Sequence, residues 1–230
     1  MRVEDKWDVY KCIFLINSKN YLYTEWEKKG MDPPIGYFSK LKAVLFSPRE
    51  FFESIQSDDR IMPAYVFMLL SLLLYGAVFG LLFALIFGGF LSTFLGPLLG
   101  MGGALFIFIF ILLFIGILFL VFSLFSFVSA GLVHLFIKLF GGQGSYTKTY
   151  QAIAYSTGVM LPGTIIMLIP FVGALAILIW QFVLLLTGLS IFHQISKMRA
   201  FCAWVLPLII ISLISFLVRV LLFESTVRTL

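Results

Sequence analysis

Between Ile61 and Phe223 the sequence contains no aspartate or glutamate at all. The chain as a whole is 61% hydrophobic and 12% charged, whereas a soluble domain carries roughly 25% charged residues. A stretch this long and this apolar belongs in hydrocarbon rather than in water. The sequence therefore predicts an integral membrane protein, with an all-α fold of transmembrane helices.

The apolar residues divide into segments of spanning length. Because a helix needs about 20 apolar residues to cross a bilayer, we expect five transmembrane helices within residues 61–230. The second is too long for a simple crossing, so it should tilt, bend or project into water near His134 and Lys138. Pro162 and Gly163 should bend or break the third. The predicted spans are residues 61–87, 104–138, 147–168, 171–194 and 201–223.

Two segments outside these spans also carry predictions. Residues 1–39 are expected to form a short polar N-terminal segment, and residues 40–60 an amphipathic entry region. Within the latter, SPRE predicts a helix from about 48 to 57 that begins with a capping box. This helix should lie along the headgroups or pack on the protein itself. The glycine-rich stretch 88–103 predicts a short interfacial or re-entrant helix near 90–99.

The basic residues predict the orientation. Ten Lys and Arg residues precede Ile61, and four more lie in the second and fourth connections between spans. The first and third connections have none. Because cytoplasmic loops carry the excess of Lys and Arg, the N-terminus should be cytoplasmic and the C-terminus outside. The net charge of +5 then belongs to loops between spans and does not indicate nucleic acid.

The spans lack the residues that membrane enzymes use. They contain no carboxylate, no HExxH sequence and no Ser/His/Asp set, so we predict no enzymatic activity, no cofactor and no metal site. His134 and His193 are each followed four residues later by a lysine. They could share a metal if their helices touch, but cations at helix C-termini are the favoured interpretation.

The sequence GGQGSYTKTY, residues 141–150, resembles a phosphate loop only superficially, because no Gly-Lys-Ser/Thr follows its glycines. The glycines should stop the second span and Ser145 should cap the third. A basic helix start could still meet a lipid phosphate. The candidate cytoplasmic binding face is therefore His134, Lys138, Tyr146, Lys148, His193 and Lys197.

A second set of polar residues is predicted near the midplane of the bilayer. They could line a wet groove, or they could form ordinary hydrogen bonds within and between helices, which is the favoured interpretation. The set is Tyr75, Ser123, Ser156, Thr157, Gln181 and Ser212.

Four segments together resemble the Yip family. They are SPREFFESI, HLFIKLFGGQGSYTKTYQAIAYST, IPFVG and GLSIFHQIS. The resemblance implies five spans, a cytoplasmic N-terminus and no known catalytic activity. Eukaryotic members interact with Rab-type GTPases, but the Asp-Leu-Tyr-Gly-Pro element expected of them is missing here. This departure favours a prokaryotic relative, located in the cell membrane.

Two functions follow as hypotheses. The first is a non-enzymatic protein that organises the membrane or recruits partners at its cytoplasmic face, where membrane lipids, a second copy or another protein would bind. The second is a conduit for lipids, as in a scramblase, or for small molecules, beside the bent third span. A membrane-embedded hydrolase is a distant third.

Overall fold

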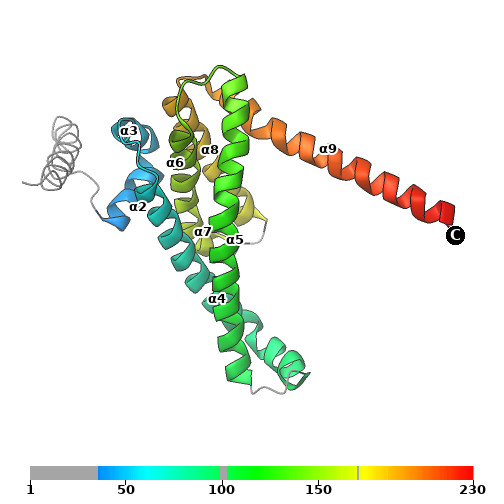
Figure 1. The fold of residues 1–230 in the computed structure, drawn as a ribbon. Coiled ribbons are helices and arrows are strands. Elements are labelled where there is room, and N and C mark those ends of the chain that lie inside the picture. Colours follow the sequence, from blue (N-terminus) through cyan, green and yellow to red (C-terminus); the bar gives the residue numbers. More distant parts are fainter. Residues whose placement is uncertain (1–35, 99–102, 170, 230) are drawn as a thin grey trace, which may run out of the picture.

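The computed structural model describes residues 36–98, 103–169 and 171–229 (Figure 1). Most of the predicted polar segment 1–39 lies outside them. Within the described residues every regular element is helical, which confirms the all-α prediction. The chain enters through two short helices, α2 (Tyr37–Phe46) and α3 (Pro48–Ser54). Pro48 occupies the start of α3 as predicted, but the Ser47 side chain makes no capping hydrogen bond, so the capping box does not form.

The next two helices form a long antiparallel hairpin. Helices α4 (Met62–Leu98) and α5 (Gly103–Leu139) each have 37 residues. They approach closely where α4 has glycines. A methyl group added at Gly76 would lie 3.3 Å from Ile115, and one at Gly80 would lie 3.3 Å from Ile111. Small residues of this kind let helix backbones pack tightly within a membrane.

No separate short helix begins near residue 90. The predicted interfacial helix at 90–99 is instead the last part of α4, which continues through Gly88 and Gly89. Glycine lowers helix propensity but keeps its N–H group, so it does not interrupt the backbone hydrogen bonds. In Figure 1 these last turns run sideways from the axis of the hairpin.

The predicted third span is not one helix. It consists of α6 (Tyr146–Ser156), a 3-10 turn η1 (Thr157–Val159) and α7 (Met160–Ile166). The expected break therefore exists, but it lies before Pro162 rather than at it. Proline fits the first turn of a helix, where its missing N–H is not needed, so Pro162 is accommodated near the start of α7.

The last two helices are α8 (Val172–His193) and α9 (Lys197–Thr229). Among the described residues, four helices are long and apolar enough to cross a membrane: α4, α5, α8 and α9. This corrects the prediction of five such helices. The difference is the third span, because η1 divides it into pieces that are individually too short.

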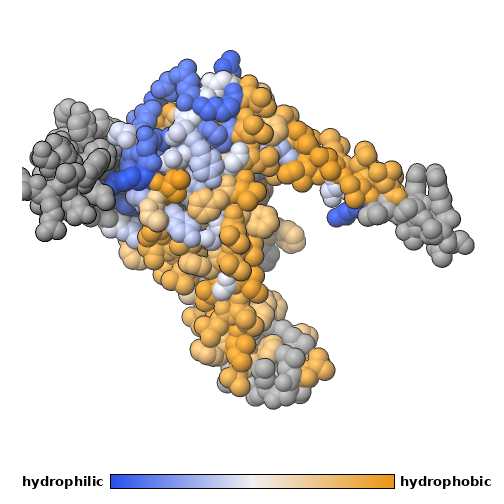
Figure 2. All heavy atoms as spheres, in the orientation of Figure 1, coloured by the Kyte–Doolittle hydropathy of each residue, from blue (hydrophilic) through white to orange (hydrophobic). Residues whose placement is uncertain are grey.

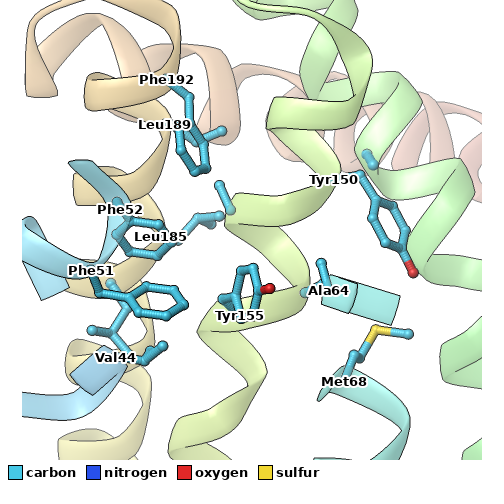
Figure 3. Close-up of a cluster of buried hydrophobic side chains, with 14 of the residues drawn as sticks. Val44, Phe51, Phe52, Ala64, Met68, Tyr150, Tyr155, Leu185, Leu189 and Phe192 are labelled. Carbon is cyan, nitrogen blue, oxygen red and sulfur yellow. The ribbon is translucent and has the colours of Figure 1, made fainter. Parts of the chain in front are cut away.

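The core lies where α3, α6 and α8 meet (Figure 3). Phe51 and Phe52 are fully buried, with edge-to-face contacts to Tyr155 at 4.9 Å and to Phe192 at 5.5 Å between ring centroids. Burying each such ring contributes roughly 1.5–3 kcal/mol. The apolar side of α3 therefore packs on the protein, which is one of the two arrangements predicted for it.

Candidate functional site at the polar end of the bundle

Hydrophilic residues gather at one end of the molecule, over α3, the start of α6 and the loop before it (Figure 2). We call this region the polar end. It comprises the α3–α4 loop, the last turn of α5, the loop from Phe140 to Ser145, the first turns of α6 and the end of α8. Five of the six residues in the predicted binding face make side-chain hydrogen bonds: His134, Lys138, Tyr146, Lys148 and His193.

Two histidines share one threonine hydroxyl. The Oγ1 atom of Thr149 lies 2.8 Å from Nδ1 of His134 and 2.9 Å from Nε2 of His193. A hydroxyl has one proton to donate, so it donates to one ring and accepts from the other. His193 is completely buried, and its Nδ1 atom has no partner in the described part of the chain. The two rings lie 5.7 Å apart between centroids, so the helices do touch here, but the Thr149 hydroxyl joins the two histidines.

The glycine loop fits closely over the end of α8. Gly141 has a φ of 85°, and the Gly142 N–H donates to the Ile137 carbonyl at 2.9 Å, which ends α5 as predicted. A methyl group at Gly144 would lie only 2.6 Å from the Phe192 carbonyl oxygen. The Gln143 N–H donates to the His193 carbonyl at 3.2 Å. The loop thus ties the ends of α5 and α8 together.

Lys148 lies inside the protein rather than on its surface. Only 5% of the residue is exposed. Its ammonium donates to the carbonyls of Ile55 at 3.1 Å and Asp58 at 2.8 Å, and it lies 3.5 Å from an Asp59 carboxylate oxygen. It also lies 5.2 Å from the centre of the Phe192 ring. These contacts bind the α3–α4 loop to α6.

Gln151, one turn further along α6, completes this attachment. Its side-chain amide donates to the carbonyls of Asp58 at 2.6 Å and Arg60 at 2.9 Å, and its oxygen accepts from Lys148 at 3.3 Å. We call Lys148 and Gln151 together the loop clamp. Neither Gln151 nor Thr149 was among the predicted site residues. Their spacing from Lys148 on one helix was the only available signal, because their partners lie far away in the sequence.

The clamped loop contains its own ion pair. The Arg60 guanidinium donates to both carboxylate oxygens of Asp58, at 2.8 and 2.9 Å. Partial burial alone would raise the pKa of Asp58, but the hydrogen bonds from Arg60, helped by the positive charge of Lys148, hold that pKa below its usual value. Asp58 is therefore ionised at neutral pH.

Three members of the predicted binding face lie further out than Lys148 and His193. Lys138 reaches the Gln143 carbonyl at 3.4 Å from an exposed position, and Lys197 is exposed at the start of α9. Tyr146 donates to the Phe127 carbonyl at 2.9 Å. Ser145 occupies the N-cap position before α6, but its side chain makes no capping hydrogen bond, which corrects the prediction that it caps the helix.

The predicted midplane residues do not line the apolar groove described below. Ser156 donates to the Ile153 carbonyl, and Thr157, the first residue of η1, donates to the Ala154 carbonyl of α6. Ser123 bonds to the Tyr65 hydroxyl across helices at 2.8 Å. The remaining three are partly or fully exposed on different helices: Tyr75 on α4, Gln181 on α8 and Ser212 on α9.

An apolar groove of about 310 Å³ lies beside the bent third segment. Pro162 and Gly163, the predicted helix break, contribute to its wall. Gly163 is needed for close packing, because a methyl group there would lie 2.8 Å from Ile177 on α8. The groove is lined by Leu45, Phe46, Val159, Pro162, Gly163, Ile166, Ala176, Ile177 and Trp180.

Metal ligands are sparse at this end of the molecule. In the described ranges no three His, Cys, Asp or Glu side chains come close enough together to hold an ion. The residues present are suited to hydrogen bonding between segments, and the cations are neutralised by carbonyls and by the carboxylates of Asp58 and Asp59.

Long apolar helices with a polar cluster at one end define a multispanning membrane protein. Residues 42–219 match the Yip1 domain, so the chain belongs to the Yip1 domain family. The match extends from α2 into α9 and includes every candidate site residue. A search of curated proteins and a search of solved structures each returned no significant match.

Proposed function

We propose that this protein is a non-enzymatic membrane protein whose polar end, facing the cytoplasm, organises the membrane or recruits partners. Membership of the Yip1 domain family supports a membrane function, and this family is not a known family of enzymes. The polar end carries the histidines, the loop clamp and the charged loop. Figure 2 shows that the other end of the α4–α5 hairpin is apolar.

One observation carries this proposal: the entry helix is a fixed part of the body. Its apolar side is buried through Phe51 and Phe52, and the loop behind it is held by the loop clamp. Arg49 and Glu50 are exposed on its other side. A helix held in one orientation presents its polar side without the entropy cost of ordering it on binding. This is what a docking platform for a partner requires.

Site-specific photocrosslinking in native membranes tests the proposal. A photoreactive amino acid at Glu50 should give discrete crosslinked products, either a second copy or another protein. The same group at Leu85, which is 73% exposed on the apolar part of α4, serves as the matched control and should react with lipid only. If Glu50 gives no protein adduct under conditions where the protein remains folded, the recruiting function is wrong.

The apolar groove favours a second candidate function, a lipid conduit. Its walls suit an acyl chain, and it lies beside the only predicted span that the structure divides, within residues 147–168. Reconstituted vesicles carrying a fluorescent lipid would reveal transbilayer movement. Ala176→Phe would fill the groove, whereas Ala174→Phe places the same bulk on an exposed position outside its lining. Lipid movement lost only in Ala176→Phe would support the conduit, and no movement in the parent protein would exclude it.

A further inference from the structure

The apolar groove beside α7 has the size and the lining of a site for a hydrocarbon chain. Its volume of about 310 Å³ lies within the range of about 300–1,000 Å³ that is usual for ligand sites. The residues that line it are all apolar, and they come from the end of α2, from η1 and α7, and from α8. Such walls suit a hydrocarbon chain better than a polar solute.

Helix α2 is fixed where it meets the groove. Its buried Leu41 packs on η1, because a methyl group at Gly158 would lie 3.0 Å from the Leu41 side chain. At its start, the Tyr37 hydroxyl donates to Ser71 of α4 at 3.0 Å. These contacts hold α2 in one orientation, so its exposed side is a defined surface.

The exposed side of α2 carries two aromatic residues and a lysine. Phe38 and Phe46 are 69% and 79% exposed, and Lys42 lies midway between them in the sequence and is also exposed. Residues four apart lie on the same side of a helix, so the three side chains form one stripe. Exposed aromatic rings beside a lysine are typical of helices that lie at the surface of a membrane.

Lys42 differs from its neighbouring cations because it has no partner. Burial lowers the pKa of Lys40, and the nearby charge of Asp58 partly offsets this effect. Arg49 is paired with Glu53 at 2.8 Å. Within the residues that the structure describes, Lys42 makes no ion pair and no side-chain hydrogen bond, and α2 itself contains no acidic residue. Its charge is therefore available to an anion from outside the chain.

Lys42 and a tryptophan lie near the same end of the groove. Phe46 belongs to the groove wall and follows Lys42 by one helical turn. Trp180 lines the groove from α8, and its ring N–H makes no hydrogen bond with any described residue. Both lie toward the polar end, because α2 packs on η1, which precedes α7, and α8 runs from Trp180 toward the polar end. Tryptophan favours the level of lipid headgroups, where its apolar ring and its N–H are both accommodated.

We propose that this groove holds one acyl chain of an anionic phospholipid whose headgroup is bound by Lys42 beside Trp180. The lysine selects a headgroup of net negative charge over a zwitterionic one, because the choline of the latter cancels the attraction. The site shares its groove with the lipid-conduit candidate and rests on the same placement in a membrane. It requires a resident lipid, however, and no movement of lipid across the bilayer. It also does not depend on recruitment of partners at the polar end.

Native mass spectrometry of the full chain in a mild detergent tests the site. The probes are phosphatidylglycerol and phosphatidylcholine with identical acyl chains, added in equal amounts. The parent protein should retain phosphatidylglycerol about fivefold more than phosphatidylcholine, which is the effect of one lysine beside an anionic headgroup. Equal retention of the two lipids, or a folded monomer that retains neither, would overturn the proposal.

Substitutions separate the roles of charge and groove. Lys42→Gln should lower the retention of phosphatidylglycerol to that of phosphatidylcholine, whereas Arg199→Gln, which removes an exposed cation from the first turn of α9, should keep the preference. Ala176→Phe should lose both lipids, and Ala174→Phe, outside the lining, should keep both. Because Lys42 is exposed, its substitution leaves the core intact and decides the matter even if Ala176→Phe does not fold. An unchanged preference in Lys42→Gln would contradict the site.

The same spectra distinguish other occupants and the other proposed functions. A dimer without lipid would mean that a second copy covers the groove, which would also overturn the proposal. Retained phosphatidylglycerol together with no lipid movement in vesicles would remove the conduit and leave this site standing. Lipid movement without selective retention would remove the site instead. Crosslinking from Glu50 reports on recruitment separately and does not involve the groove.

Discussion

Lys148 is a buried cation whose partners are mostly backbone carbonyls of a loop 90 and 93 residues earlier in the chain. A carbonyl has only partial negative charge, so several are needed where a single carboxylate would otherwise be the partner. Asp59, at 3.5 Å, adds a full negative charge, and the ionised Asp58 carboxylate adds a weaker attraction. The residue that appeared from the sequence to be free for a lipid phosphate is therefore engaged by the protein itself, and its role as a binding residue stays a prediction.

The loop clamp predicts a loss of stability on substitution. Lys148→Met keeps most of the apolar side chain but removes the ammonium, and with it the hydrogen bonds to the Ile55 and Asp58 carbonyls and the ion pair with Asp59. We expect the free energy of unfolding to fall by about 1–3 kcal/mol. Thermal unfolding in detergent measures this. Lys138→Met, which loses only an exposed contact of 3.4 Å, is the control and should change stability by less than about 0.5 kcal/mol.

Thr149 permits a sharper test, because valine has nearly the same shape. Thr149→Val removes the hydroxyl that joins the histidines and leaves both ring nitrogens of buried His193 without partners. Stability should fall by about 1–3 kcal/mol, whereas Thr149→Ser should retain most of it. The same unfolding assay applies. Equal stability of the valine and serine variants would show that the hydroxyl does not matter.

At the scale of elements, the sequence predicted where helices end or divide better than which distant segments contact one another. Gly141 and Gly142 end α5 because only local backbone geometry is involved. The division of the third span was expected from its glycine and proline, yet η1 lies earlier, since Pro162 fits the first turn of α7. The roles of Thr149 and Gln151 could not be predicted, because both depend on segments that meet only in the folded protein.

At the scale of the whole molecule, the distribution of basic residues predicts which side of the membrane the polar end faces. On intact cells, an impermeant lysine reagent should leave Lys138 and Lys197 unmodified, although both are exposed in the protein. A lysine introduced by Thr93→Lys provides the positive control. Thr93 is exposed near the end of α4, in the first connection, which is predicted to lie outside, so this lysine should react. Mass spectrometry of the labelled peptides would decide. Modification of Lys138 and Lys197 from outside would reverse the orientation.

The loop clamp also has a consequence for biosynthesis. Residues 55–60 leave the ribosome well before Lys148, because 90 residues separate Lys148 from Asp58. Until α6 is made, the carbonyls of this loop have no ammonium to bind, and Phe51 of α3 has no Tyr155 ring to pack against. The α4–α5 hairpin is therefore synthesised, and enters the translocon, before α3 can pack against α6 and α8. The beginning of this domain is completed only by a segment from its middle, so translation halted before residue 148 would leave Phe51 and Phe52 without a place to pack.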